Sequence, residues 1–158
     1  MKKSIYLVFA LLTIAALLLS GCAKTEETTA TEAATVEAPA GDIALKVTGL
    51  VTTEMGWTED EVKAMENVTV QATNKDGELK DYTGVSLNAL LDLAGVSADA
   101  TAVVFVADDG LTGEVTLAEL RACADCIVSF RDQGGFSTVL PGFPNNVQVK
   151  GVVEIQVK

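Results

Sequence analysis

Residues 82–110 read YTGVSLNALLDLAGVSADATAVVFVADDG, and this stretch decides the predicted fold. After the glycine turn, Ser86 is a candidate N-cap, because its side-chain oxygen can accept from the amides of a first helical turn. Apolar residues then recur at helical spacing, which predicts a helix with one buried face: Leu87, Leu90, Leu91 and Ala94. Gly95 suits the left-handed conformation that ends a helix. The sequence therefore predicts a short helix over residues 87–94.

The second half of this stretch predicts a buried strand. Residues 102–107 (AVVFVA) include no polar position, as expected for a strand that is covered on both faces. The sequence Asp108-Asp109-Gly110 is a strong turn signal. A helix packed on a sheet is the simplest arrangement of these two elements.

The chain before this stretch predicts an entry strand and a second helix. Ile43, Leu45 and Val47 alternate with polar or small residues, so they are expected on the buried face of a strand. Residues 58–61 (TEDE) form a capping-box pattern that opens a short helix ending near Met65. Trp57 is interpreted as a hydrophobic staple on this helix.

Further strands are predicted on both sides of the central stretch. They are a hairpin of residues 68–72 and 78–82 around the turn 74–77, then strands 114–117, 127–130 and 136–140, with a helical turn at 118–122. In the last strand, Val153, Ile155 and Val157 are expected to face the core. The predicted fold class is α+β, a compact mixed β-sheet domain with short helices.

Residues 82–110 and the ending VQVKGVVEIQVK (residues 147–158) resemble the sulfite-oxidase-like family of oxidoreductase molybdopterin-binding domains. The resemblance implies that fold, a pterin–molybdenum cofactor and oxidoreductase activity. Active members hold molybdenum through a cysteine thiolate upstream of the glycine turn, and arginine and histidine side chains bind the pterin phosphate. A proline- and glycine-containing segment before the final strands lies near their cofactor. By this resemblance, Arg131 and Phe143 are candidate pocket residues, with ordinary loop residues as the alternative.

The chain departs from this family at the metal ligand. The corresponding stretch, residues 68–82 (VTVQATNKDGELKDY), has no cysteine, the chain has no histidine, and its arginines are Arg121 and Arg131. Threonine, asparagine and glutamine cannot replace a soft thiolate ligand. We therefore expect no metal site and no molybdenum catalysis, and a bound molybdopterin is not expected.

The N-terminus predicts an exported lipoprotein. Lys2 and Lys3 precede an apolar run over residues 5–19, which is too short to cross a bilayer as a helix. LSGC (residues 19–22) resembles the lipobox of bacterial lipoproteins, which implies a signal peptide over residues 1–21 and a lipid on Cys22. A plain secretory signal or a membrane helix with a chance cysteine is the alternative.

An acidic tether over residues 22–41, rich in Thr, Ala and Glu, is predicted to lead to a globular domain over residues 42–158. Loss of residues 1–21 removes Lys2 and Lys3 but no acid, which changes the net charge from −11 to −13. Such a charge argues against nucleic acid as a partner. The expected location is extracytoplasmic, at a bacterial membrane through the lipid anchor, with an unidentified protein or small molecule as partner.

Cys123 and Cys126 form a CxxC sequence, and a disulfide between them suits an oxidising compartment. Haem attachment is excluded because Ile127, not histidine, follows the second cysteine. A zinc site would need further ligands. A thiol–disulfide redox pair stays open, because a disulfide that closes so small a loop constrains little entropy.

Three functions are compatible with these patterns. The first is a non-catalytic binding or redox-accessory module that has the fold without the metal ligand. The second is an oxidoreductase-like protein that still binds a pterin cofactor. The third is a thiol–disulfide redox protein that uses Cys123 and Cys126. The missing thiolate, histidine and arginines favour the first over the second.

Overall fold

The computed structural model describes residues 41–74 and 76–158. The predicted signal peptide, Cys22 and all but the last residue of the predicted tether lie outside the described residues. The elements are β1 (Leu45–Gly49), β2 (Met55–Trp57), α2 (Glu59–Ala64), β3 (Asn67–Thr73), β4 (Leu79–Ser86), α3 (Leu87–Ala94), β5 (Ala102–Ala107), β6 (Thr112–Thr116), α4 (Leu117–Ala122), β7 (Ile127–Phe130), β8 (Phe136–Val139), the 3-10 helix η1 (Asn145–Val147) and β9 (Lys150–Val157). None of the helices in these residues has both the length and the hydrophobicity to span a membrane.

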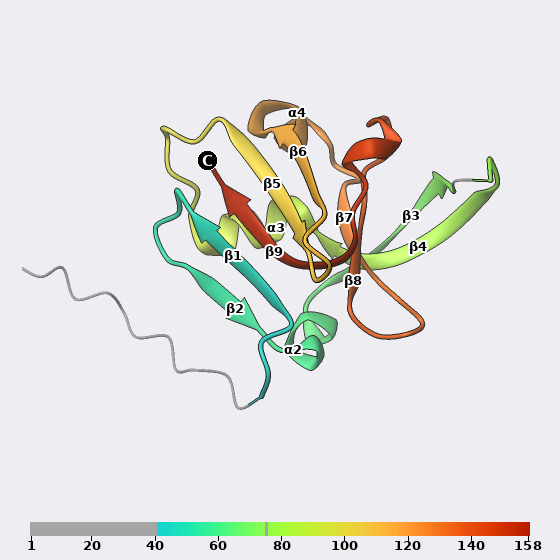
Figure 1. Ribbon diagram of the computed structural model, residues 1–158, viewed down its shortest axis with the longest axis horizontal. Helices are drawn as coiled ribbons and strands as arrows, with labels where there is room; N and C mark the ends of the chain where they lie inside the picture. The colour runs from blue at the N-terminus through green and yellow to red at the C-terminus, as the bar shows by residue number, and fades with distance from the viewer. Residues whose placement is uncertain (1–40, 75) are drawn as a thin grey trace, which may run out of the picture. The chain divides into compact units, whose positions relative to one another are not determined.

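The strands form one mixed sheet, as the sequence predicts. Their order is β2-β1-β9-β8-β7-β4-β3, with β5 paired to β9 and β6 paired to β5. Only β1 and β9 run parallel among the described pairs. The last strand, β9, pairs with β1, β5 and β8 and passes through the middle of the domain, while the β3–β4 hairpin extends to one side (Figure 1). This confirms the α+β fold class.

Helix α3 confirms the central prediction. Its four predicted core residues are buried, and Gly95 ends the helix in the left-handed conformation with φ 68°. Ser86, however, makes no side-chain capping hydrogen bond, so that prediction was wrong. Ser86 is still the last residue of β4, where it pairs with Ile127, and the amide of Leu87 donates to the backbone oxygen of Cys126 at 3.0 Å. A neighbouring segment thus supplies an acceptor for the first amide of the helix, whereas a capping serine would accept from the second or third amide.

Two strand ends differ from the predicted alternation. Ile43 precedes β1 and is 38% exposed, so it is not a core residue of that strand. Val153 is also 38% exposed, whereas Val152 is in the core. Val106 of β5 opposes Glu154 while Ala107 opposes Val152, so Val153 is the extra residue of a β-bulge. Alternation beyond a bulge moves to the other face of the sheet, which explains the error.

The described residues form one main hydrophobic core, and their buried polar side chains are hydrogen-bonded. Phe105, Phe136 and Ile155 lie at its centre, and Trp57 of β2 is also buried there. A smaller cluster of Val70, Ile127 and Val139 packs the β3–β4 hairpin against β7 and β8. Within the described residues, no buried side-chain nitrogen or oxygen lacks a hydrogen-bond partner. A hydrophobic core and paired buried polar groups are two of the features of an independently folding domain, and the described residues have both.

Candidate functional site

An open groove of about 1190 Å³ lies between the β3–β4 hairpin, strands β7 and β8, and the loop that leads into β9. Its lining is mainly polar side chains and loop backbone. Its lining includes Gln71, Asp76, Lys80, Asp81, Arg131, Asp132, Leu140, Phe143, Gln148 and Lys150. Because loops carried on a rigid sheet are the usual place for binding sites, this groove is the candidate functional site.

The hairpin wall of the groove is held by side-chain hydrogen bonds across its two strands. Gln71 donates to Asp81 at 2.8 Å, and the hydroxyls of Thr69 and Thr83 lie 2.9 Å apart. At the turn, the side-chain oxygen of Asn74 accepts from the amide of Glu78 at 2.9 Å. These hydrogen bonds hold the polar side chains of the hairpin in place.

The opposite wall is the loop of residues 140–149, which is tied to β8 at both ends. The side-chain amide of Gln148 donates to the backbone oxygen of Leu140 at 2.8 Å and accepts from its amide at 3.0 Å. One residue further on, the amide of Val149 donates to the hydroxyl of Thr138 at 2.7 Å. The loop carries Phe143 into the groove lining. Its position is therefore set by a closed set of hydrogen bonds.

The groove has no dominant charge. Three cations line it, Lys80, Arg131 and Lys150, and three carboxylates accompany them, Asp76, Asp81 and Asp132. Lys80 lies 3.8 Å from Glu78, whereas Arg131 and Lys150 form no ion pair with any described residue. A lining of this kind suits a polar ligand that carries both hydrogen-bond donors and hydrogen-bond acceptors.

The turn between β7 and β8 is anchored from α2. Glu59 accepts a hydrogen bond from the amide of Gly135 at 3.2 Å and forms a 2.6 Å ion pair with Lys63. The hydrogen bond from Lys63, followed by that from the Gly135 amide, lowers the pKa of Glu59 below its ordinary value. The turn that carries Arg131 and Asp132 is thereby held by a charged side chain.

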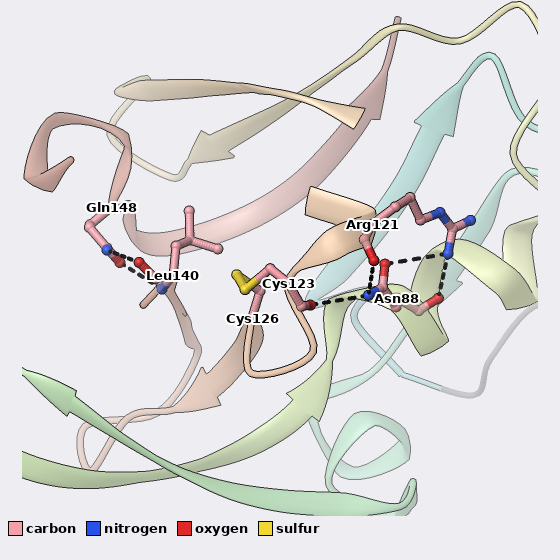
Figure 2. Close-up of a disulfide and its surroundings, with 6 residues drawn as sticks. All are labelled: Asn88, Arg121, Cys123, Cys126, Leu140 and Gln148. Atoms are coloured by element: carbon pink, nitrogen blue, oxygen red, sulfur yellow. Dashed lines mark hydrogen bonds between the residues drawn. A yellow bond between two sulfur atoms is a disulfide. The ribbon is translucent and has the colours of Figure 1, made fainter. Parts of the chain in front are cut away.

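Cys123 and Cys126 form a disulfide between α4 and β7 (Figure 2). The side chain of Asn88 on α3 donates to the backbone oxygen of Cys123 at 3.2 Å, and Arg121 donates to Asp92 at 2.6 Å. Figure 2 shows Asn88 and Arg121 on one side of the disulfide and Leu140 on the other. Cys126 is fully buried, and neither cysteine lines the groove.

The structure brings together some of the residues that the sequence singles out and separates others. Arg131 and Phe143 both line the groove, although their role in binding stays a prediction. The cysteine pair lies outside this lining, and Cys22 lies outside the described residues. In the described part of the chain, no group of three or more His, Cys, Asp or Glu side chains is arranged to hold a metal ion.

Sequence reasoning missed the contributions of Gln148 and Lys150. Both were expected only as parts of the last loop and strand. The side chain of Gln148 forms the hydrogen bonds that a neighbouring strand would otherwise form with Leu140. Because these two residues lie eight positions apart, no helical or strand periodicity in the sequence indicates the contact. The groove itself depends on long-range pairing of β4 with β7, which the local pattern does not encode.

Comparison with known proteins agrees with this arrangement. The family model described as "Oxidoreductase molybdopterin binding domain" matches residues 32–158. No curated protein sequence matches the chain. Among solved structures, the chain is similar to the sulfane dehydrogenase SoxCD from Paracoccus pantotrophus, with 19% sequence identity and a TM-score of 0.63. That likeness covers 73% of this chain but only 38% of the SoxCD chain, so it concerns the fold of one part of a longer protein.

Proposed function

Because the chain belongs to the family of oxidoreductase molybdopterin-binding domains, we propose that it is a non-catalytic binding or redox-accessory module of this family. In this proposal a lipid on Cys22 holds the domain at a bacterial membrane, outside the cytoplasm. The groove between the β3–β4 hairpin and the 140–149 loop binds its ligand or partner.

One observation carries the non-catalytic part of the proposal. Cys123 and Cys126 are the only cysteines in residues 41–158, they are bonded to each other, and neither lines the groove. The groove therefore offers carboxylates, hydroxyls and amides but no thiolate. Molybdenum in this family takes a soft sulfur ligand from the protein, and this donor set does not fit that requirement.

The groove supports the binding part of the proposal. Arg131 and Lys150 supply donors that form no ion pair with a described carboxylate, and Phe143 supplies an aromatic surface in the same groove. A guanidinium and an aromatic ring are frequent anchors in binding surfaces, because both give large contact areas. The ligand class that fits is a polar organic molecule, or a polar segment of a partner protein.

The disulfide agrees with the proposed location. Disulfides persist in extracytoplasmic compartments and are rare in a reducing cytoplasm. Acyl chains on Cys22 would keep the domain at the membrane surface, since two or more chains are needed for stable attachment.

The test of this proposal is the molybdenum content of the exported domain, residues 41–158, produced in a host that makes molybdenum cofactor. Elemental analysis is expected to find far less than one molybdenum per chain. One molybdenum per chain, lost on substitution of a groove residue such as Asp76, would contradict the proposal. A catalytically loaded member of the family, produced in the same host, controls for cofactor supply.

A further inference from the structure

Strand β3 is an open edge of the sheet. It comes last in the strand order and pairs with β4 alone among the described strands. Its seven residues form an unbroken antiparallel register with β4, from Asn67 opposite Val85 to Thr73 opposite Leu79. Figure 1 shows the hairpin extending away from the other strands, so one side of β3 is not covered by any described element.

This edge lacks the usual features that block strand addition. Proteins protect open edges with charged side chains, proline, bulges or very short strands. The sequence of β3, NVTVQAT, has no charge and no proline, and its pairing has no bulge. The other two edges are protected: β2 has only three residues, and β6 has a charged residue, Glu114, at its centre. Among the described strands, β3 is therefore the long edge left free for pairing.

We propose that β3 pairs with β3 of a second copy of this chain, antiparallel and centred on Val70. The strand is self-complementary in this register. Val70 would face its own copy, Val68 would face Ala72, and Thr69 would face Gln71. Apolar side chains alternate with polar ones around Val70. In this register, apolar side chains therefore meet apolar ones on one face of the paired strands, and polar side chains meet polar ones on the other face.

The packing and charge of the hairpin favour a second copy as the occupant. Val68, Val70 and Ala72 already pack with Tyr82 on one face of the hairpin, so pairing would continue this apolar row across the two-fold axis. The chain has a net charge of −11, and two copies repel each other at long range. An uncharged strand is the part of such a chain at which two copies can meet without opposing like charges.

The experiment measures self-association of residues 41–158 by sedimentation velocity from micromolar to millimolar concentration. The test variant combines Thr69→Lys with Gln71→Lys, which places two lysine–lysine pairs across the axis. The matched control combines Leu79→Lys with Thr83→Lys, which adds the same charge to the same hairpin face, on β4 rather than on the edge strand. Circular dichroism confirms that each variant is folded.

We expect a dimer that becomes stronger with added salt, because salt screens the repulsion between the acidic copies. The test variant should weaken dimerisation by roughly tenfold, since two like-charged pairs would face each other, while the control should change it little. Amide hydrogen exchange in β3 should slow as the protein concentration rises. A monomer at the highest concentration would overturn the proposal. A dimer whose formation leaves β3 exchange unchanged, or one weakened equally by both variants, would overturn it as well.

Discussion

Gln148 pairs with both backbone polar groups of Leu140, donating to its oxygen at 2.8 Å and accepting from its amide at 3.0 Å. The side chain thus acts as a short strand partner where β8 ends. Leu140 is fully buried, so these two backbone groups have no access to water as an alternative partner. Together with the hydrogen bond from the amide of Val149 to Thr138, this contact holds the loop that carries Phe143 into the groove.

Replacement of Gln148 with leucine should destabilise the domain by about 1–3 kcal/mol, because it leaves the buried amide of Leu140 unpaired. The backbone oxygen of Leu140 loses one donor but still accepts from the amide of Phe143 at 3.2 Å. Urea unfolding measures the change. Gln133→Leu is the matched control, because that glutamine also lines the groove but is exposed and is expected to cost little. Equal losses for the two variants would show that the Gln148 contact has no special role.

Joint replacement of Cys123 and Cys126 with alanine should lower stability by about 2 kcal/mol, as expected for a disulfide that closes a very short loop. The fold should persist, because α3, α4 and β7 are also joined by the contacts of Asn88 and Leu87. Chemical denaturation with and without reductant measures the effect. The reduced wild type should match the variant. Complete unfolding of the variant would mean that the disulfide holds far more of the structure than these contacts suggest.

Glu59 should make the stability depend on pH in the acid range. Its pKa is lowered in the folded protein from an ordinary value of 4.5, mainly by the hydrogen bond from Lys63. A lowered pKa contributes stability above 4.5, and this contribution is lost as the pH falls through the folded value. The Glu59→Gln variant should therefore be less stable than the wild type at neutral pH and equal to it in strong acid.

Unfolding free energies at a series of pH values check this prediction. Glu66→Gln is the control, since Glu66 is exposed and forms no ion pair among the described residues. A difference between Glu59→Gln and the wild type that stays constant from neutral to strongly acidic pH would contradict the assignment.

The Cys22→Ser variant should leave the membrane fraction, because serine cannot receive the thioether-linked lipid. Cell fractionation followed by detection of the protein measures this, and metabolic labelling with a radioactive fatty acid gives an independent reading. A variant that stays in the membrane fraction would refute the lipid anchor and favour a membrane helix instead.

Much of the fold could be predicted because its central elements carry their own signals. Helix α3 has an apolar stripe and a glycine stop, and β5 has an unbroken apolar run, so local patterns sufficed for both. Strand β2 was missed because three residues are too few for alternation to appear, and only pairing with β1 defines it. Val153 was placed on the wrong face because a bulge depends on two partner strands rather than on the residue itself.

The candidate site was only partly predictable. The family resemblance pointed to Arg131 and Phe143, and both line the groove. Gln148 and the Glu59 contact to Gly135 could not be inferred, because each joins residues whose proximity arises only from the folded sheet. Composition and short motifs describe such side chains as ordinary loop and helix residues.

The central claim is that the domain has the fold of molybdopterin-binding oxidoreductases without the metal chemistry, and native mass spectrometry tests it most directly. Residues 41–158 are exported in a host that makes molybdenum cofactor, and spectra are recorded with and without reductant. We expect a bare chain, lighter than its reduced form by the two hydrogens lost on forming the Cys123–Cys126 disulfide. A bound mass that matches a pterin cofactor would contradict the claim.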